Sequence, residues 1–322
     1  MRVTRRSALA GLSAFLVSPG FSVESWPNRP ITFLTGYAPG GSTDTVARIV
    51  ADGLSRRLGQ SVFVELKSGA AGTLASAQVA HAAPNGYTWL VIASGFATTA
   101  ATYRKLPFRP IEDFSIVGML TEFPLVLATH RDHPVRTMSE LISVARLGQQ
   151  RLLYGTPGVG STQHLAGELL AKMANVQFQH VPYRGGTPAI IDLVAKQLDF
   201  VIDPAAGLTE FFKEGRLRAL GITGQTQDPG LPDIPTVGES GVPGYVVSSW
   251  HGLVAPAGLP APLMVRINAE LSNVLVDSEV VDRLKALALT PRSSSSEAFK
   301  ARIEADIKKW SDVVASANIE RI

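Results

Sequence analysis

An alternation of short β-rich runs with helical patterns, beginning at Pro30, limits the possible folds of this chain more than any other feature. The runs at residues 31–37, 62–66 and 88–93 are rich in β-branched and aromatic residues, and helical patterns separate them. Such an alternation is typical of βαβ units, in which strands pair in parallel and helices cover the sheet. The first part of the chain is therefore predicted to form an α/β lobe.

A second series with the same alternation follows later in the chain. Its β-rich runs at residues 152–154, 178–182 and 200–203 enclose two further helical patterns. A chain of 322 residues is too long for one typical core and about right for two. Hydrophobic residues at 45% and charged residues at 18% are those of an ordinary packed protein. Two α/β lobes are therefore predicted.

The last part of the chain is predicted to be helical, because Ser294 and Glu297 have the spacing of a capping box. Apolar residues then repeat every three or four positions, at Phe299, Ile303, Ile307, Trp310 and Val314. This repeat predicts a helix with one face buried on a neighbouring lobe. Upstream, the Pro- and Gly-rich stretch at residues 228–245 predicts an ordered surface excursion or connection rather than a core element.

The start of the chain has the charge-then-apolar order of an export signal. Arg2, Arg5 and Arg6 precede an apolar run at residues 8–17, so a signal peptide is predicted over residues 1–25. The paired arginines also resemble part of a twin-arginine signal, which leaves both that route and the Sec route open. A buried or anchoring N-terminal helix is the alternative. No later segment offers about 20 uninterrupted apolar residues, so the mature protein is expected to be soluble.

A glycine-rich turn, Pro39-Gly40-Gly41-Ser42, lies between the first predicted strand and the first predicted helix. Glycines let backbone amides approach a ligand closely, and the positive end of the helix dipole favours a negatively charged oxygen there. The turn is therefore predicted to hold a carboxylate or a phosphate. Asp44 falls in the first helical turn, where it offsets the same dipole, so its expected role is structural.

A matching turn at residues 155–162 lies between a strand and a helix of the second series. Its glycine spacing resembles a P-loop, but Ser161 stands where the phosphate-binding lysine is required, which disfavours an ATPase. The first turn lacks the G-x-G-x-x-G spacing of dinucleotide-binding folds. One glycine-rich turn is a weak signal, whereas two turns, one in each predicted lobe, favour a shared anionic ligand.

Ser161 and His164 raise the alternative of a serine hydrolase. The nucleophile-elbow pattern G-x-S-x-G is absent around Ser161, so an enzyme is not predicted. His130 and His133 lie in a polar turn rather than at helical metal-site spacing, and the chain has no cysteine. Neither a metal nor a cofactor is expected. The net charge of +3 comes from interspersed basic and acidic residues, which makes nucleic acid an improbable partner.

Short motifs along nearly the whole mature chain match one known family in order. They include Trp26-Pro27-Asn28-Arg29-Pro30-Ile31, Ala38-Pro39-Gly40-Gly41, Pro84-Asn85-Gly86-Tyr87-Thr88, His180-Val181-Pro182-Tyr183-Arg184-Gly185, Trp250-His251-Gly252-Leu253 and Ala255-Pro256-Ala257-Gly258. With these motifs the chain resembles the extracytoplasmic solute receptors of tripartite tricarboxylate transporters, the Bug family. Two segments depart from the family pattern, at residues 66–72 and at residues 203–206.

The resemblance implies an α/β, two-lobe periplasmic-binding-protein architecture of the Venus flytrap, type II-like kind, with two crossover segments as the hinge. Lobe I is expected at residues 26–123 and 249–322, and lobe II at residues 124–248. The protein is accordingly expected in the periplasm, as a monomer. Its implied partners are a small carboxylate and the permease subunits of a tripartite tricarboxylate transporter. A receptor that feeds a two-component sensor kinase is the alternative.

The resemblance also implies where the carboxylate binds. Backbone amides, hydroxyls and bridging water of the two glycine-rich turns are expected to clamp it, and three further residues to face the cleft. The expected ligand-binding residues are Pro39, Gly40, Gly41, Ser42, Thr156, Gly158, Gly160, Ser161, Thr162, His164, Tyr183, Arg184 and Asp203. Dicarboxylates, tricarboxylates, amino acids, nicotinate-like acids and aromatic acids all remain open as the ligand.

Overall fold

The computed structural model describes residues 26–149, 151–228 and 230–322, so the predicted signal peptide lies outside the described residues. The strands are β1 (Ile31–Thr35), β2 (Val62–Leu66), β3 (Thr88–Ala93), β4 (Phe114–His130), β5 (Leu152–Thr156), β6 (Phe178–Pro182), β7 (Phe200–Pro204), β8 (Leu217–Ile222), β9 (Ser248–Pro256) and β10 (Thr290–Pro291). The helices are α1 (Ser42–Leu58), the short 3₁₀ helix η2 (Ala70–Gly72), α2 (Thr73–Ala80), α3 (Gly95–Thr102), α4 (Met138–Leu147), α5 (Thr162–Ala174), α6 (Gly186–Val194), α7 (Ala205–Lys213), α8 (Ala261–Val274), α9 (Ser278–Lys285) and α10 (Ser296–Ser316).

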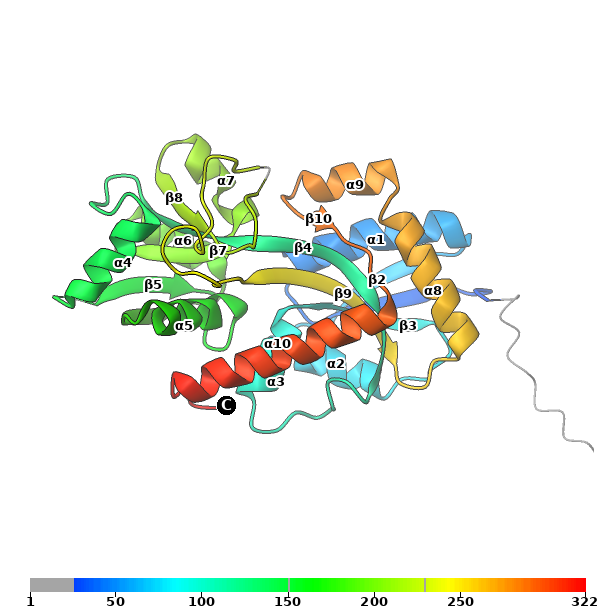
Figure 1. The fold of residues 1–322 in the computed structure, drawn as a ribbon. Coiled ribbons are helices and arrows are strands. Elements are labelled where there is room, and N and C mark those ends of the chain that lie inside the picture. Colours follow the sequence, from blue (N-terminus) through cyan, green and yellow to red (C-terminus); the bar gives the residue numbers. More distant parts are fainter. Residues whose placement is uncertain (1–25, 150, 229) are drawn as a thin grey trace, which may run out of the picture.

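The first lobe is built on β1, which pairs in parallel with β2 on one side and with β3 on the other. Helix α1 buries one stripe of apolar side chains, including Val46, Val50 and Leu54, against this sheet, and it packs beside α8 and α9. Helices α2, α3 and α10 cover the opposite face (Figure 1). The alternation of strands and helices expected from the sequence is present here.

The second lobe repeats this construction around β5, which pairs in parallel with β6 and β7. Helices α4 and α5 bury one face in the same core cluster as α3 and α10, whereas α6 and α7 pack in a separate cluster on the other face. One hydrophobic core therefore extends through both lobes on the side that α10 covers. Figure 1 shows α10 lying beneath the first lobe and reaching α5 of the second.

The two lobes are joined by β4 and β9, which run side by side in antiparallel pairing (Figure 1). The first part of β4, up to Pro124, pairs with β9, and the part from Leu125 onward pairs with β7 and β8. Strand β4 thus belongs to the sheets of both lobes, whereas β9 pairs with β3 and with the first part of β4. The predicted α/β fold with two lobes and two crossover segments is confirmed.

Two details differ from the sequence analysis. The N-cap of α10 is Ser295, whose hydroxyl accepts a hydrogen bond from the Ala298 amide at 3.1 Å, whereas Ser294 Oγ accepts from the Met119 amide of β4 at 3.0 Å. The capping-box prediction was therefore wrong by one residue. The described part of the 228–245 stretch forms no helix or named strand, but it is not wholly on the surface, because Tyr245 is buried in the core.

Candidate ligand cleft

A cavity of about 360 Å³ lies where the parallel strands of both lobes end. Its wall includes residues that follow β1, β3 and β5 and the last residue of β7, which is the edge where open α/β sheets bind ligands. The first residues of three helices are among them, namely Ser42 of α1, Gly95 of α3 and Thr162 of α5. Within the described chain, no Asp, Glu, Lys or Arg side chain lines this cavity. Helix N-termini and neutral side chains therefore make up most of its described wall, together with Ile322.

The first-lobe wall is the start of α1, which has Gly41 as its N-cap and no side-chain cap. The opening of a helix leaves the amides of its first residues without intrahelical acceptors, so those of Ser42 and Thr43 are available to a ligand. Asp44 is buried, and both of its carboxylate oxygens contact neighbouring groups of the first lobe. Its Oδ2 accepts a hydrogen bond from the Gly40 amide at 2.9 Å, and its Oδ1 lies 2.8 Å from Arg48 Nε. Asp44 thus shapes the turn.

The second-lobe wall is the turn that leads into α5. Ser161 is the N-cap, and its hydroxyl accepts from the His164 amide at 3.1 Å. The Gly160 amide donates to His164 Nδ1 at 3.1 Å, and the Ser161 amide donates to the Gly158 carbonyl at 3.2 Å. These bonds fix the turn and leave the amides of Thr162 and Gln163, the first two of α5, for a ligand.

His164 stabilises the second glycine-rich turn and is not placed to act as a base. Because its Nδ1 accepts from Gly160, the ring proton is on Nε2, 3.8 Å from Glu168 Oε1. The ring stacks on His180 at 3.9 Å between centroids, and His180 Nε2 lies 2.6 Å from Thr156 Oγ1. Burial, together with a smaller effect of the nearby His180, lowers the pKa of His164 to about 3. Neither nitrogen of His164 is arranged to activate Ser161, so the hydrolase alternative has no geometric support.

The two lobes touch across the cavity. Ser94, just before α3, bonds to Thr162 of α5 at 3.0 Å and to Ser249 of β9 at 2.6 Å. A Cβ built on Gly160 would lie 3.0 Å from Thr102 Oγ1 of α3, so the second glycine-rich turn approaches the first lobe closely. These contacts connect the two lobes across the cleft.

Five of the expected ligand-binding residues lie in the cavity wall, namely Ser42, Gly158, Gly160, Ser161 and Thr162. Eight do not: Pro39, Gly40, Gly41, Thr156, His164, Tyr183, Arg184 and Asp203. Both glycine-rich turns border one cavity, but the first reaches it through Ser42 and Thr43 rather than through the glycines.

The three expected residues outside the glycine-rich turns have other surroundings. The Tyr183 hydroxyl donates to Asp192 of α6 at 2.7 Å, and Arg184 is exposed. Asp203 lies behind the wall, where it accepts a hydrogen bond from Gln163, a residue that does line the cavity. Burial raises the pKa of Asp203 to about 7. Asp203 is therefore placed to orient Gln163.

Several wall residues were missed by the sequence analysis. Tyr37 and Thr99 line the first-lobe side, and Ser249 and His251 line it from β9. Burial raises the pKa of Tyr37 to about 12, so its phenol stays protonated and can donate. The repeat of threonines at positions 98, 99 and 102 was a usable signal, because it places hydroxyls along one side of a short helix. Nothing local distinguishes Ser249 or His251.

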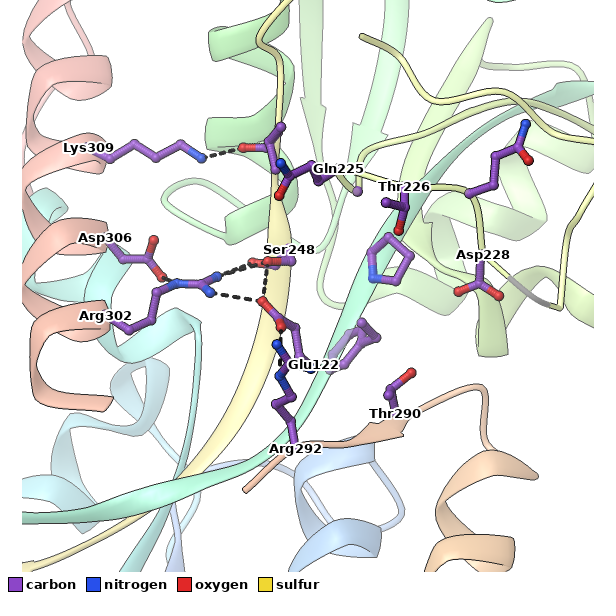
Figure 2. A pocket seen from close by; sticks show the side chains of 15 residues that line it. Glu122, Gln225, Thr226, Asp228, Ser248, Thr290, Arg292, Arg302, Asp306 and Lys309 are labelled. Carbon is purple, nitrogen blue, oxygen red and sulfur yellow. Dashed lines mark hydrogen bonds and ion pairs between the residues drawn. The ribbon is translucent and has the colours of Figure 1, made fainter. Parts of the chain in front are cut away.

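A second cavity, of about 480 Å³, lies on the other side of the crossover strands (Figure 2). Ser248 lines it while Ser249 lines the cleft, because adjacent residues of a strand point to opposite faces. Most of its charged groups are already bonded to protein groups: Arg302 lies 2.9 Å from Glu122 and 3.0 Å from Asp306, and Lys309 donates to the Val246 carbonyl at 2.6 Å. The cavity of about 360 Å³ between the lobes is the candidate ligand site, because three helix N-termini line it.

The fold and the cleft define a two-lobe receptor of the periplasmic-binding-protein class. Solved structures of this class match the chain closely. The periplasmic binding protein BugD is 32% identical with a TM-score of 0.79, covering 92% of this chain and 99% of that one. R. palustris Rpa4515 with adipate is 32% identical with a TM-score of 0.82 and coverage of 92% and 100%. MatC (Rpa3494) from Rhodopseudomonas palustris with bound malate is 36% identical with a TM-score of 0.78 and coverage of 90% and 100%.

The family follows from the sequence comparisons. The family model described as "Tripartite tricarboxylate transporter family receptor" matches residues 46–319. A protein of Pseudomonas sp. strain P51, encoded in the tcbD-tcbE intergenic region, is 33% identical over 316 residues, covering 97% of this chain and 94% of that relative. The chain belongs to this receptor family, whose members are periplasmic solute-binding proteins and not enzymes. None of its described helices has the length and apolar character needed to cross a bilayer.

Proposed function

We propose that this receptor captures a small carboxylate in the cavity between its lobes and delivers it to the permease subunits of a tripartite tricarboxylate transporter. One observation carries the ligand part of the proposal: helices of both lobes begin at a cavity that has no ionised side chain in its described wall. Each helix N-terminus carries about half a positive charge and free amides, which favour an anion. We also propose that the mature chain is exported and acts in the periplasm.

The proposed contacts come from both lobes. In the first lobe they are the amides of Ser42 and Thr43 and the Ser42 hydroxyl, and in the second lobe they are the amides of Thr162 and Gln163. Gly158, Gly160 and Ser161 shape the second turn around the ligand. Among the remaining expected residues, Gly40, Thr156, His164 and Asp203 hold the turns and the wall in place through hydrogen bonds. No ligand contact is proposed for Pro39, Gly41, Tyr183 and Arg184. Adipate and malate in two relatives support linear dicarboxylates as first probes.

We also propose that the lobes divide at residues 123/124 and 248/249. In support of this division, β4 changes partner from β9 to β7 between Pro124 and Leu125. The first lobe then comprises residues 26–123 and 249–322, and the second lobe residues 124–248.

Calorimetry and thermal unfolding on the mature protein test the ligand part. We expect one binding site, and an unfolding midpoint that rises with the concentration of malate, adipate or another acid of a broad panel. At a free ligand concentration of 100 times Kd the stabilisation should be about 2.7 kcal/mol. The diamides of the same acids are the matched controls, because they keep the shape and lose the charge. A folded protein that binds no acid of the panel would contradict the proposal.

Delivery needs a separate experiment. Membrane vesicles that contain the permease subunits should take up the bound acid only when the receptor is added. If uptake is unchanged by the receptor while an adjacent sensor kinase responds to the liganded form, the protein serves sensing instead.

A further inference from the structure

His251 connects the ligand cleft to the crossover strands. It lies on β9 directly opposite Thr121 of β4, and its ring lines the cavity. Nδ1 lies 2.7 Å from Thr121 Oγ1, and Nε2 lies 3.3 Å from Ser42 Oγ at the start of α1. The ring also stacks on Phe123 with 5.3 Å between centroids. The side chain is only 1% exposed, so these contacts hold the ring in one orientation.

The hydrogen-bond partners determine which ring nitrogen carries the proton. The Thr121 side chain is fully buried, and within the described residues its hydroxyl has no partner other than His251. A buried hydroxyl that cannot reach water must donate to its one acceptor, so Thr121 donates to Nδ1. Burial lowers the pKa of His251 to about 3, which keeps the ring neutral. The single ring proton is then on Nε2 and points to Ser42 Oγ.

The same reasoning fixes the direction of the Ser42 hydroxyl. Because Nε2–H donates to Ser42 Oγ, that oxygen acts as the acceptor in this bond, and its own proton is directed elsewhere. Among the described residues Ser42 Oγ has no second partner, and Ser42 lines the cavity. The hydroxyl proton is therefore free to bond with an oxygen of the ligand.

We infer that His251 is a positioning residue that sets the Ser42 hydroxyl as a hydrogen-bond donor to the bound carboxylate. The inference rests on the proposed carboxylate-binding function and adds a residue that does not itself need to touch the ligand. Without the imidazole, Ser42 could donate to other acceptors or turn its lone pairs to the cavity, where they would repel a carboxylate. We call the hydrogen-bonded series Thr121–His251–Ser42 the relay. Because Thr121 and His251 pair across the two crossover strands, the relay also connects Ser42 to the hinge that these strands form.

Two conservative variants separate the two ends of the relay. In His251→Gln the side-chain amide reaches the position of Nε2 and can still donate to Ser42, whereas in His251→Asn it reaches only the position of Nδ1 and Thr121. We expect His251→Gln to bind malate or adipate, whichever the wild type binds, within about threefold of wild type. His251→Asn and Ser42→Ala should each bind about 10-fold more weakly. The double variant of Ser42→Ala with His251→Asn should be no weaker than Ser42→Ala alone, because both remove one donor.

The inference would be overturned if the affinity losses of Ser42→Ala and His251→Asn multiplied in the double variant. It would also be overturned if His251→Gln and His251→Asn lost the same affinity. The ring tautomer supplies a readout that needs no variant. Nitrogen NMR of the unmodified protein should show a neutral His251 protonated on Nε2, and protonation on Nδ1 would overturn the assignment even if both variants failed to fold. If the wild type bound no acid of the panel, the proposed function would be contradicted instead. The tautomer of His251 could still be measured, because that measurement needs no ligand.

Discussion

Gly160 is a residue at which the second lobe closely approaches the first. Its φ of +77° lies in the left-handed region, and an added Cβ would lie 3.0–3.4 Å from three atoms of Thr102. Its amide is bonded to His164 Nδ1, so the residue also anchors the turn. A glycine is needed here for two separable reasons, the backbone conformation and the close approach of α3.

Gly160→Ala should weaken ligand binding about 10-fold, because the new methyl group holds Thr102 and the second lobe apart when the cleft closes. Gly148→Ala is the matched control. Gly148 has a similar φ of +64°, but an added Cβ there meets nothing within 4 Å, and the residue lies at the end of α4 away from the cleft. Both variants should lose about 1 kcal/mol of unfolding free energy through backbone strain.

Calorimetry and urea unfolding on both proteins check the prediction. An unchanged affinity in Gly160→Ala would mean that the lobes do not need this approach to hold a ligand. An equal loss of affinity in Gly148→Ala would assign the effect to stability instead.

The residue scale also shows what a sequence can and cannot reveal about the cleft. Ser42 and Thr162 were predicted because each begins a helix directly after a glycine-rich turn, which is a local pattern. His251 was not, since its partner Ser42 lies 209 positions away in the chain. Arg184 was expected at the cleft because its segment was assigned there through family resemblance, yet its side chain is exposed. Side-chain direction depends on tertiary packing that no local motif encodes.

At the scale of elements, α10 holds the two crossover strands together. Arg302 of α10 lies 2.9 Å from Glu122 of β4 and donates to Ser248 Oγ of β9 at 2.9 Å (Figure 2). Asp306, one turn later, pairs with Arg302 at 3.0 Å and accepts from Trp250 Nε1 of β9 at 2.7 Å. The neighbouring carboxylates raise the pKa of Arg302 although burial acts to lower it. The helix therefore braces the hinge from behind the ligand cleft.

Arg302→Met should lower the free energy of unfolding by about 2 kcal/mol, because it leaves Glu122 and Asp306 partly buried without their cation. Lys308→Met is the matched control on the same helix. Lys308 pairs with Asp312 at 2.8 Å, but both side chains are mostly exposed, so the change should stay within about 0.5 kcal/mol. Urea unfolding followed by circular dichroism measures both, and equal effects in the two variants would show that the hinge cluster contributes no more than a surface pair.

The crossover strands are also the elements that the sequence predicted least well. Short strands such as β2, β3 and β6 were expected at the residues where they occur, because turn residues bound them on both sides. Strand β4 extends over 17 residues and is buried along most of its length, so it shows no alternation of polar and apolar residues. The lobes were evident from repeated local patterns, whereas the path between them depends on pairing at long range.

At the scale of the whole molecule, stability should depend on three buried histidines. Burial lowers the pKa of His164, His180 and His251 to about 3, 4 and 3, respectively. All three lie at the cleft wall or directly behind it, in His164–His180 stacking and in the Thr121–His251–Ser42 relay. The folded protein keeps them neutral, whereas the unfolded chain protonates them near pH 6.5.

The sign of the pH dependence follows from proton counting. Between about pH 4 and 6.5 the unfolded state binds more protons at these histidines, so the unfolding free energy falls as the pH is lowered through this window. Above pH 6.5 their contribution is constant. Asp203 acts in the opposite direction, because its pKa is raised to about 7 and the folded state binds the extra proton between pH 3.8 and 7. Three histidines outweigh one aspartate, so we expect a net loss of stability on acidification.

Two variants isolate these contributions. His180→Gln can keep the bond to Thr156 Oγ1 without a titrating group, so it should retain on the order of 2 kcal/mol more of its neutral-pH stability at pH 4 than wild type does. Asp203→Asn removes the opposing contribution and should make the loss of stability between pH 7 and 4 steeper. Urea unfolding at half-unit pH steps measures the slopes. If His180→Gln shows the wild-type slope, His180 is not neutral in the folded protein, and the stacked pair beneath the second turn does not carry the acid sensitivity.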